Sequence, residues 1–583
     1  MVLKQVRNVW NTLHGSEPLE PTKRQLTIAG VCGVLVVGFM ATVAARMASP
    51  TIHPDEWGFL TNGQALIGHV EAPIPTGSFY PAGFGIITGV AGLLTGSLSG
   101  AYRVTLFVNI VFALLTAWCA GRLAVKTFKA SSNVGRLVSV LVLVLPGTIV
   151  SAMFAWPEIA ARLAFLGFIA LVFRAVRSAQ RNDAIILCLF TGLMPGLHGR
   201  FTLLMPVIAL LCVWLWRVKR LAFTSLAMSG TAMVLGYAGS YFINKFVKAS
   251  IYLESYDQEN RLLSRLFRPD LWPALLRTMV GQTWYLLATT VGIVGLGIAF
   301  AVRSALANRR GRESDEAQWA ESVTLAVLAF SMFSIIFTGG LQLLHGNRGD
   351  HLMYGRYVEM MVPAVVVVAV VALSRRDVFA SKAWFASLLV MPMLSIAYVI
   401  VDGGDGVKGG ASRRNIVFPN IVGADAARYV VSPGFLTFTA FFLAVGVALW
   451  LISRKSRSVA VVALVLLFAV GDVTSGQRSL LTRSDNMEGA TNTIQMVKDS
   501  GSTLVGFDSG IRNDPSYYYL RYRLHPVRIV RFDFSSPGTK VPATYNCLYG
   551  WGDKPPADGK WAIVADEPGV ARVLWQRVGS PHC

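Results

Sequence analysis

Charged residues are scarce in this sequence: Asp, Glu, Lys and Arg make up 15% of the 583 residues, whereas hydrophobic residues make up 54%. Soluble proteins carry about 25% charged residues, so the composition excludes an ordinary soluble protein and indicates a polytopic membrane protein. Acidic residues are scarcer than basic ones, 32 against 53, which gives a net charge of +21. Because the basic residues fall between apolar runs, membrane topology explains them and no nucleic-acid partner is expected.

Cysteine is also scarce, and six residues in a chain of this length do not make a disulfide framework. Those in apolar runs are expected to be small buried hydrophobes: Cys32, Cys119, Cys188 and Cys212. Cys547 and Cys583 lie in the hydrophilic tail, and they form a candidate disulfide if that tail lies outside the cell.

Several catalytic motifs are absent as well. The sequence has no Gly-x-x-x-x-Gly-Lys-Ser/Thr phosphate loop, no Gly-x-Ser-x-Gly turn and no His-Glu-x-x-His helix. It therefore shows no sign of nucleotide-driven chemistry, which agrees with a site on the outer face of a membrane, where nucleotides are scarce.

Long apolar runs, by contrast, are abundant. The first one, Gln25 to Ala45, has no charged residue and matches the roughly 20 residues that a membrane-spanning helix needs. A cleavable signal peptide has a shorter apolar core of about 7–15 residues, so we expect a retained helix, and the basic residues before it predict a cytoplasmic N-terminus. In total, the runs predict about 13 spans: 26–46, 102–122, 136–156, 157–174, 183–198, 200–216, 221–245, 283–303, 321–343, 357–374, 383–401, 433–453 and 457–473.

Alternate connections between these spans are rich in lysine and arginine, which places them on the cytoplasmic side by the positive-inside rule. These basic connections lie at 122–136, 174–181, 217–220, 303–312, 375–382 and 454–457. The pattern holds only if the apolar segment 82–98 does not cross the membrane. We therefore predict one long external loop, residues 47–101, and a tail outside the cell.

Proline and glycine break two of the spans. Pro146-Gly147 interrupts the third span, and Pro195-Gly196 ends the fifth just before His198 and Arg200. Irregular backbone at membrane depth is tolerated only where it packs on protein or lines a cavity. We therefore expect both breaks to face protein or a cavity.

The tail from residue 474 onward has a different pattern. Helical periodicity near 490–499, 517–522 and 570–578 alternates with strand-like runs at 503–507, 527–532 and 561–564. Such alternation over about 110 residues indicates a small α/β domain. The sequence thus predicts an all-α polytopic membrane domain, residues 1–473, followed by an extracytoplasmic α/β domain, residues 474–583.

The most distinctive polar motif, directly after the first span, is His53-Pro54-Asp55-Glu56-Trp57. Carboxylates at a membrane edge are functional-site candidates because they are costly to keep there. Asp55 and Glu56 could deprotonate a hydroxyl, bind a divalent cation or cap the start of a helix. We predict a catalytic role for Asp55. For Glu56, a catalytic role and a structural role stay equally open. His53 and Trp57 are expected to line the substrate site.

A second polar cluster joins two spans on the same external face. It reads His345-Gly346-Asn347-Arg348-Gly349-Asp350-His351, followed by Tyr354-Gly355-Arg356-Tyr357. The planar guanidinium of arginine matches phosphate oxygens, so we predict that Arg356 holds a lipid phosphate, with an interfacial anchor as the alternative. His345 and Asp350, together with Glu56, are weak candidates for a metal site.

Further polar residues lie on the same side. Glu158 and Arg162 are one helical turn apart at the outer end of the fourth span, where they either neutralise each other or face the site. His198 and Arg200 are expected to reach the same cavity. The predicted substrate-binding residues are completed by Tyr80 and Tyr354.

Together these motifs resemble the GT-C superfamily of polytopic glycosyltransferases, over about residues 20–470. The resemblance is carried by Asp55-Glu56 after the first helix, Phe79-Tyr80-Pro81 at a surface helix, Tyr102-Arg103 at the second span, and Arg356-Tyr357 with Pro363 downstream. It implies an inverting transferase with an external active site and a sugar donor linked to polyprenyl phosphate.

By this resemblance, Asp55 would deprotonate the acceptor hydroxyl, while Arg356, Tyr357 and His351 would hold the departing phosphate. The sugar would be a hexose or a pentose, and the acceptor a cell-envelope glycan, a lipid or a protein. No cofactor is implied, although a divalent cation stays an open alternative. The enzyme would lie in the plasma membrane as a multi-pass protein.

Two other interpretations stay open. A transporter of lipid-linked sugars would favour inverted repeats with broken helices in matching halves, and the sequence shows no such repeat. A ligase or polymerase of lipid-linked oligosaccharides would use the external loop that carries His351 and Arg356, and it would not need Asp55.

Overall fold

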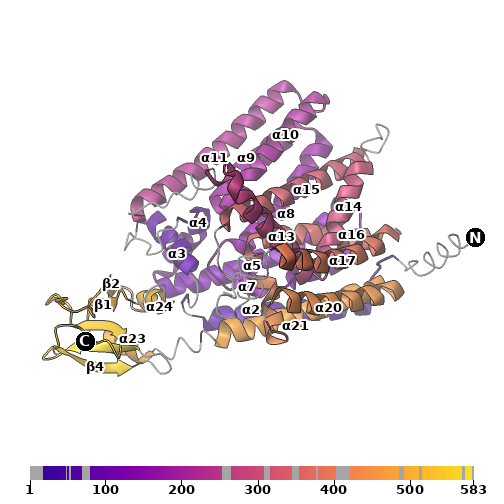
Figure 1. Cartoon of the computed structure of the whole chain (residues 1–583). Helices are drawn as coiled ribbons and strands as arrows, with labels where there is room; N and C mark the ends of the chain where they lie inside the picture. The colour runs from indigo at the N-terminus through magenta and orange to yellow at the C-terminus, as the bar shows by residue number, and fades with distance from the viewer. Residues whose placement is uncertain are drawn as a thin grey trace, which may run out of the picture.

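The computed structural model shows a helical body with a small sheet domain at the C-terminal end (Figure 1). The described residues are 18–47, 49–50, 54–68, 79–252, 264–307, 316–344, 353–375, 378–401, 421–432, 434–482, 484, 491–510, 515–566, 572–580 and 583. The architecture confirms the predicted fold class, an all-α polytopic protein with a small C-terminal α/β domain.

Within the described residues, nine helices are long and apolar enough to cross a membrane. They are α2 (Lys23–Arg46), α5 (Leu98–Lys126), α8 (Glu158–Ser178), η1 with α10 (Gly199–Arg217), α11 (Phe223–Ile251), α15 (Glu316–Gln342), α17 (Val378–Val401), α20 (Phe435–Lys455) and α21 (Arg457–Gly476), which η8 (Gln477–Leu481) extends. Each of them lies at a predicted span.

The other four predicted spans are short or broken. The span at 136–156 is divided into α6 (Ser132–Leu143) and α7 (Thr148–Ala152), and α9 (Arg181–Leu197) has only 17 residues. The span at 357–374 begins with the 3-10 turns η4 (Gly355–Tyr357) and η5 (Glu359–Met361), which lead into α16 (Val362–Ser374).

The predicted span at 283–303 is divided between two helices. The short turn η2 (Pro269–Leu271) leads into α13 (Trp272–Thr289), which is followed by α14 (Ile293–Ala307) at a bend of 111°. Gly292 makes this corner at a φ of 82°, a conformation that glycine adopts without strain. Hydropathy does not register such a corner, because the segment is apolar on both sides of it.

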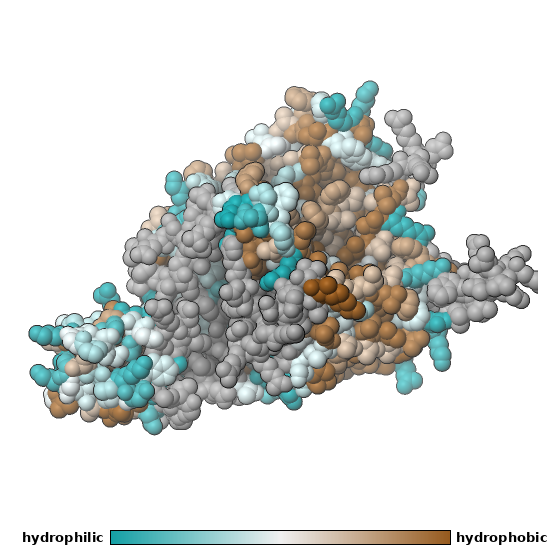
Figure 2. Space-filling view, viewed as in Figure 1, coloured by the Kyte–Doolittle hydropathy of each residue, from teal (hydrophilic) through white to brown (hydrophobic). Residues whose placement is uncertain are grey.

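Short polar residues fix where several spanning helices begin. Thr22 forms a capping box with Gln25 at the start of α2, and serines cap α5, α6 and α21. The outward faces of the helices carry many exposed apolar side chains. Figure 2 shows this hydrophobic surface over the helical body, whereas the sheet domain is mostly hydrophilic on the face in view. An apolar face of this extent is suited to contact with lipid.

The break between α6 and α7 is sealed by side chains from other helices. Asp472 of α21 accepts from the backbone N–H groups of Gly147 and Ile149, each at 2.9 Å. Asn109 of α5 donates to the carbonyl oxygens of Ala152 and Phe154, at 3.0 and 2.8 Å. The irregular backbone after Pro146 therefore packs on protein, as expected for a broken span at membrane depth.

Two short helices, α3 (Pro54–Leu66) and α4 (Gly83–Thr95), pack tightly against each other. A Cβ on Gly63 would lie 2.1 Å from Thr88 Oγ1 and 2.6 Å from the backbone nitrogen of Gly89, so only glycine permits this approach. With 13 residues, α4 is shorter than a membrane span. Its length agrees with the prediction that 82–98 does not cross, and the side of the membrane stays a prediction.

The tail forms a five-stranded sheet in the order β2-β1-β3-β5-β4. β1 (Leu504–Asp508) is parallel to β2 (Arg528–Phe532) and β3 (Cys547–Trp551), and β5 (Arg572–Arg577) is antiparallel to β3 and β4 (Trp561–Asp566). The helices α23 (Thr491–Asp499) and α24 (Pro515–Arg523) accompany the sheet, and η7 (Val422–Tyr429) belongs to the membrane body.

The predicted helix at 570–578 was wrong, because its central residues form strand β5. Val573, Leu574 and Trp575 are buried between two neighbouring strands. A run of three apolar residues between arginines is too short for its periodicity to distinguish a helix from a strand, and the pairing on both sides decides.

Candidate active site

Asp55, Glu158 and Arg356 meet in space although they are far apart in sequence. Arg356 lies in η4, Asp55 in the first turn of α3, and Glu158 at the first residue of α8. Arg356 Nη1 donates to Asp55 Oδ2 at 2.5 Å, and Arg356 Nε donates to Glu158 Oε1. The structure thus brings together the two groups that the sequence argument pairs, residues 55 and 356, and their roles stay predictions.

These three side chains differ in exposure. Those of Glu158 and Arg356 are 3% and 6% exposed, whereas that of Asp55 is 19% exposed. The guanidinium carbon of Arg356 also lies 4.1 Å from the centre of the Trp156 ring, a cation–π contact. Glu158 and Trp156 therefore fix the plane of the guanidinium, and Asp55 is the member that a ligand reaches most easily.

The second oxygen of Asp55 is held by Tyr80. Its hydroxyl donates to Asp55 Oδ1 at 2.7 Å. The Tyr80 ring reaches this position by lying across Gly58, where an added Cβ would come within 2.2 Å of the ring. Glycine at position 58, one turn after Asp55, is therefore required for the Tyr80 contact.

Glu56 takes different partners from Asp55 and is fully buried. Its Oε1 accepts from the hydroxyl of Tyr102 at 3.2 Å and from the backbone N–H of Ala155 at 2.9 Å. Burial raises the pKa of Glu56 to about 8, although these two hydrogen bonds act in the opposite direction. The geometry gives Glu56 a structural place beside the site, and a catalytic role for it stays a prediction.

The local pairing of Glu158 with Arg162 is contradicted. Glu158 pairs with Arg356, and Arg162 Nη2 lies 3.1 Å from Glu359 Oε2. Tyr285 donates to the other oxygen of Glu359 at 2.6 Å. Spacing by one helical turn favours a local pair, but in a buried setting partners from other elements offer these groups more hydrogen bonds.

Arg200 forms a second buried cationic centre near Arg356. Its guanidinium lies over the Tyr357 ring, 3.1 Å from the ring centre. It donates to His198 Nε2 at 2.9 Å and to Gln342 Oε1 at 3.1 Å. The structure therefore places His198, Arg200 and Tyr357 in one cluster. The positive charges of Arg200 and Arg356 are close enough to repel each other.

Four predicted site residues lie outside the described residues: His53, His345, Asp350 and His351. Two further predicted substrate-binding residues, Trp57 and Tyr354, are buried. Trp57 packs edge-on against Tyr522 of α24, with ring centres 5.8 Å apart, and Tyr354 lies beside Tyr357 at 4.3 Å. A substrate contact for either residue stays a prediction.

Sequence reasoning did not predict the contacts of several residues that build the site. The Trp156 ring packs against the guanidinium of Arg356. The hydroxyls of Tyr102 and Tyr285 donate hydrogen bonds to Glu56 and Glu359, respectively. For Glu359 a signal was available: it lies three residues after Arg356 in an otherwise apolar stretch, where a carboxylate needs a partner. The aromatic residues carry no such signal, because aromatic side chains are frequent throughout the spans.

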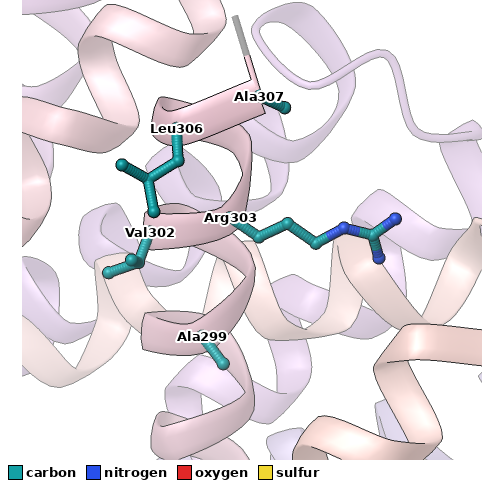
Figure 3. A pocket seen from close by; sticks show the side chains of 5 residues that line it. All are labelled: Ala299, Val302, Arg303, Leu306 and Ala307. Carbon is teal, nitrogen blue, oxygen red and sulfur yellow. The ribbon is translucent and has the colours of Figure 1, made fainter. Parts of the chain in front are cut away.

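No group of three or more His, Cys, Asp or Glu among the described residues is arranged to hold a metal ion. A surface pocket of about 740 Å³ lies on α14, and Figure 3 shows Arg303 pointing away from Val302 and Leu306 on its walls. Figure 1 places α14 well away from α3. The pocket therefore does not belong to the cluster around Asp55.

The thiols of Cys547 and Cys583 are free and buried in the structure. They lie next to each other, and the Cys583 thiol lowers the pKa of Cys547 through a hydrogen bond. The predicted disulfide between them stays a prediction.

No family model matches the sequence, and no curated protein matches it either. Among solved structures, ArnT from Cupriavidus metallidurans bound to undecaprenyl phosphate is similar over 94% of this chain and 98% of that chain, with a TM-score of 0.52 and 14% identity. Its apo state has a TM-score of 0.49 over 93% and 97% of the two chains at 14% identity. Arabinosyltransferase EmbB from Mycobacterium smegmatis has a TM-score of 0.41 over 77% and 41%, also at 14% identity.

The chain therefore has the fold of ArnT, which is the fold that the resemblance to the GT-C superfamily implies. This finding confirms, at the level of the fold, the resemblance that the sequence motifs indicate. At 14% identity the likeness shows the fold alone, so the chemistry has to be argued from the site itself.

Proposed function

We propose that this protein is a membrane glycosyltransferase that transfers a sugar from a polyprenyl-phosphate donor to an extracytoplasmic acceptor. The ion pair between Asp55 and Arg356 carries the proposal, because it joins a carboxylate that solvent reaches to a buried guanidinium. Such a transfer needs these two groups, a base for the acceptor hydroxyl and a cation for the leaving phosphate. The GT-C fold supports the proposal, as does the undecaprenyl phosphate bound to ArnT.

The proposed reaction is a single displacement at the anomeric carbon. Asp55 accepts the proton of the acceptor hydroxyl while the hydroxyl oxygen forms a bond to this carbon. The bond from the carbon to the phosphate oxygen breaks, and polyprenyl phosphate leaves with the electron pair. The anomeric configuration inverts, and a positioned base of this kind accelerates a reaction by about 10²–10⁴-fold.

Asp55 has to leave Arg356 before it acts as a base. Both of its oxygens are engaged, one by Arg356 and the other by Tyr80. A donor phosphate that binds Arg356 competes with Asp55 for the same N–H donors, so its arrival releases the carboxylate. Glu158 keeps Arg356 Nε and holds the guanidinium in place during this exchange. Donor binding is therefore expected to precede deprotonation of the acceptor.

Arg200 adds a second positive charge for the phosphate. Its partners within the described part of the chain are neutral: Tyr357, His198 and Gln342. None of these three partners forms an ion pair with Arg200, so a phosphate at this position can bind the guanidinium directly. We therefore assign Arg200, with Arg356 and Tyr357, to the donor phosphate. The two arginines together balance Asp55 and Glu158.

A transfer assay with the full-length protein in nanodiscs tests the proposal. Undecaprenyl-phosphate-linked hexoses and pentoses serve as donors, and an envelope extract supplies acceptors. We expect Asp55→Asn to lower transfer by about 10²–10⁴-fold while the protein still folds and inserts. The matched control is Asp270→Asn, which changes an exposed carboxylate paired with Arg268 and should leave transfer unchanged.

Full activity of Asp55→Asn would remove Asp55 from the mechanism. Loss of activity in Arg356→Ala and His351→Ala, but not in Asp55→Asn, would favour the ligase or polymerase interpretation instead.

A further inference from the structure

The C-terminal domain contacts the membrane body through α24. This helix lies against α5 and against α3, the helix that carries Asp55 and Glu56 (Figure 1). Tyr522 of α24 is 2% exposed, and its ring packs against Trp57 of α3 and Tyr102 of α5 with ring centres 5.8 and 6.0 Å away. Its hydroxyl donates to the carbonyl oxygen of Leu98 at the start of α5. One side chain of the tail therefore contacts both helices.

A second residue of α24 acts on the same tryptophan. The guanidinium of Arg521 lies 5.2 Å from the centre of the Trp57 ring, which is itself buried. Trp57 is thus contacted by two consecutive residues of the tail. Because α3 is continuous from residue 54 to residue 66, a constraint on Trp57 also constrains the first turn, where Asp55 lies.

The contacts continue from the tail to both sides of the proposed site. Tyr102, which packs on Tyr522, donates to Glu56 Oε1 at 3.2 Å. The same oxygen accepts from the backbone N–H of Ala155 at 2.9 Å. Ala155 directly precedes Trp156, and the centre of the Trp156 ring lies 4.1 Å from the guanidinium carbon of Arg356. The series therefore ends beside the guanidinium that we assign to the donor phosphate.

We propose that Tyr522 is a positioning residue, through which the C-terminal domain holds α3 so that Asp55 lies opposite Arg356. The consequence for transfer rests on the proposed function, whereas the contact itself does not. Without the Tyr522 ring, Trp57 and Tyr102 lose their shared neighbour and α3 gains freedom. Asp55 then spends less time in reach of the acceptor, while Arg356 still holds the phosphate.

Hydrogen–deuterium exchange on the full-length protein in nanodiscs tests this inference. We expect Tyr522→Ala to speed amide exchange of the peptide that covers residues 54–66 by about tenfold, because the helix opens more often. Tyr522→Phe keeps the ring and should restore most of the protection. Arg521→Ala, a substitution at a partly exposed residue, should give a smaller increase and serves if Tyr522→Ala does not fold.

The same variants separate positioning from a general structural role. Tyr522→Ala should lower kcat for transfer by about tenfold, while the Kd for undecaprenyl phosphate stays within about twofold of wild type. The control is Tyr545→Ala, which removes a ring that packs on Phe532 within the sheet domain and should leave exchange at 54–66 unchanged.

Unchanged exchange at 54–66 in both α24 variants, in a protein that transfers sugar, would overturn this inference alone. Equal loss of phosphate binding and of transfer in Tyr522→Ala would also overturn it, because the whole site would then be deformed. Faster exchange in Tyr522→Ala, when the wild type itself transfers no sugar, would overturn the proposed function and leave the contact in place.

Discussion

Two buried arginines occupy neighbouring sites in this protein, and they differ in how completely they are enclosed. Arg162 pairs with Glu359, and the two side chains are only 1% and 4% exposed. Arg162 also donates to Thr148 Oγ1 and Ser151 Oγ, at 3.0 and 3.1 Å. Arg356 instead pairs with one enclosed carboxylate and with Asp55, whose side chain is 19% exposed.

Exposure separates an ion pair that stabilises the fold from one that a ligand can reach. The enclosed pair of Arg162 and Glu359 joins α8 to η5, and every partner that the structure describes for it belongs to the protein core. The open pair can exchange a protein carboxylate for a ligand anion, because one of its members reaches solvent. An enclosed pair that loses a member leaves a buried charge, whereas an open one can be compensated by water or ligand.

Two matched amide substitutions test this division, and they carry the largest expected effects. Glu359→Gln leaves Arg162 without a carboxylate and should destabilise the protein by about 3–5 kcal/mol. Asp55→Asn leaves Arg356 paired with Glu158 and should change stability by less than about 1 kcal/mol. Thermal unfolding of both variants in one detergent measures the contrast.

The two substitutions should affect transfer activity in the opposite order. Folded Glu359→Gln should retain transfer, and Asp55→Asn should lose it. Equal destabilisation by the two substitutions would show that exposure does not separate these ion pairs.

A smaller effect on transfer is expected from substitution of Gly58, against which the Tyr80 ring packs. In Gly58→Ala the new methyl group takes the place of the Tyr80 ring, which lies 2.2 Å from the added Cβ, so the hydroxyl no longer reaches Asp55. We expect transfer to fall by about tenfold, because a displaced orienting group lowers the fraction of productive geometries. Gly30→Ala in α2, where an added Cβ meets nothing within 4 Å, is the control and should keep full activity. Wild-type transfer in Gly58→Ala would exclude Tyr80 as an orienting group.

A further prediction concerns the pH dependence of stability. Burial raises the pKa of Glu56 to about 8 from its ordinary value of 4.5, so the folded protein favours the neutral carboxyl. The stability that this group contributes is therefore complete below about pH 4.5 and is lost as the pH rises towards 8. We expect the thermal midpoint of the wild type to fall over this interval and Glu56→Gln to show a flatter profile. Identical profiles for the two proteins would contradict a buried neutral Glu56.

The sequence predicted the fold class and most spans, because membrane helices are read from long apolar runs and from the bias of basic loops. It also placed Asp55 and Arg356 on one face of the membrane. Their convergence on one site was predicted, but their direct hydrogen bond was not, since 301 residues separate them and no local spacing encodes that contact. The local spacing of Glu158 and Arg162 predicted a pair that does not form. Each of them pairs with a residue from another element instead.

The corner at Gly292 and the strand β5 escaped prediction for a related reason. Both lie in short apolar segments whose periodicity does not distinguish the alternatives, and neighbouring elements decide their conformation. The contact between α24 and α3 depends on Tyr522 and Trp57, and aromatic residues of this kind occur throughout the chain.

Binding of undecaprenyl phosphate, measured for the wild type, Asp55→Asn and Arg356→Gln, tests whether the donor phosphate displaces Asp55 from Arg356. In the proposed mechanism, the donor phosphate takes the place of Asp55 on Arg356. Removing the competing charge in Asp55→Asn should therefore leave the affinity equal or higher, whereas Arg356→Gln should weaken it by about tenfold or more. Weaker binding in Asp55→Asn together with unchanged binding in Arg356→Gln would rule out this exchange.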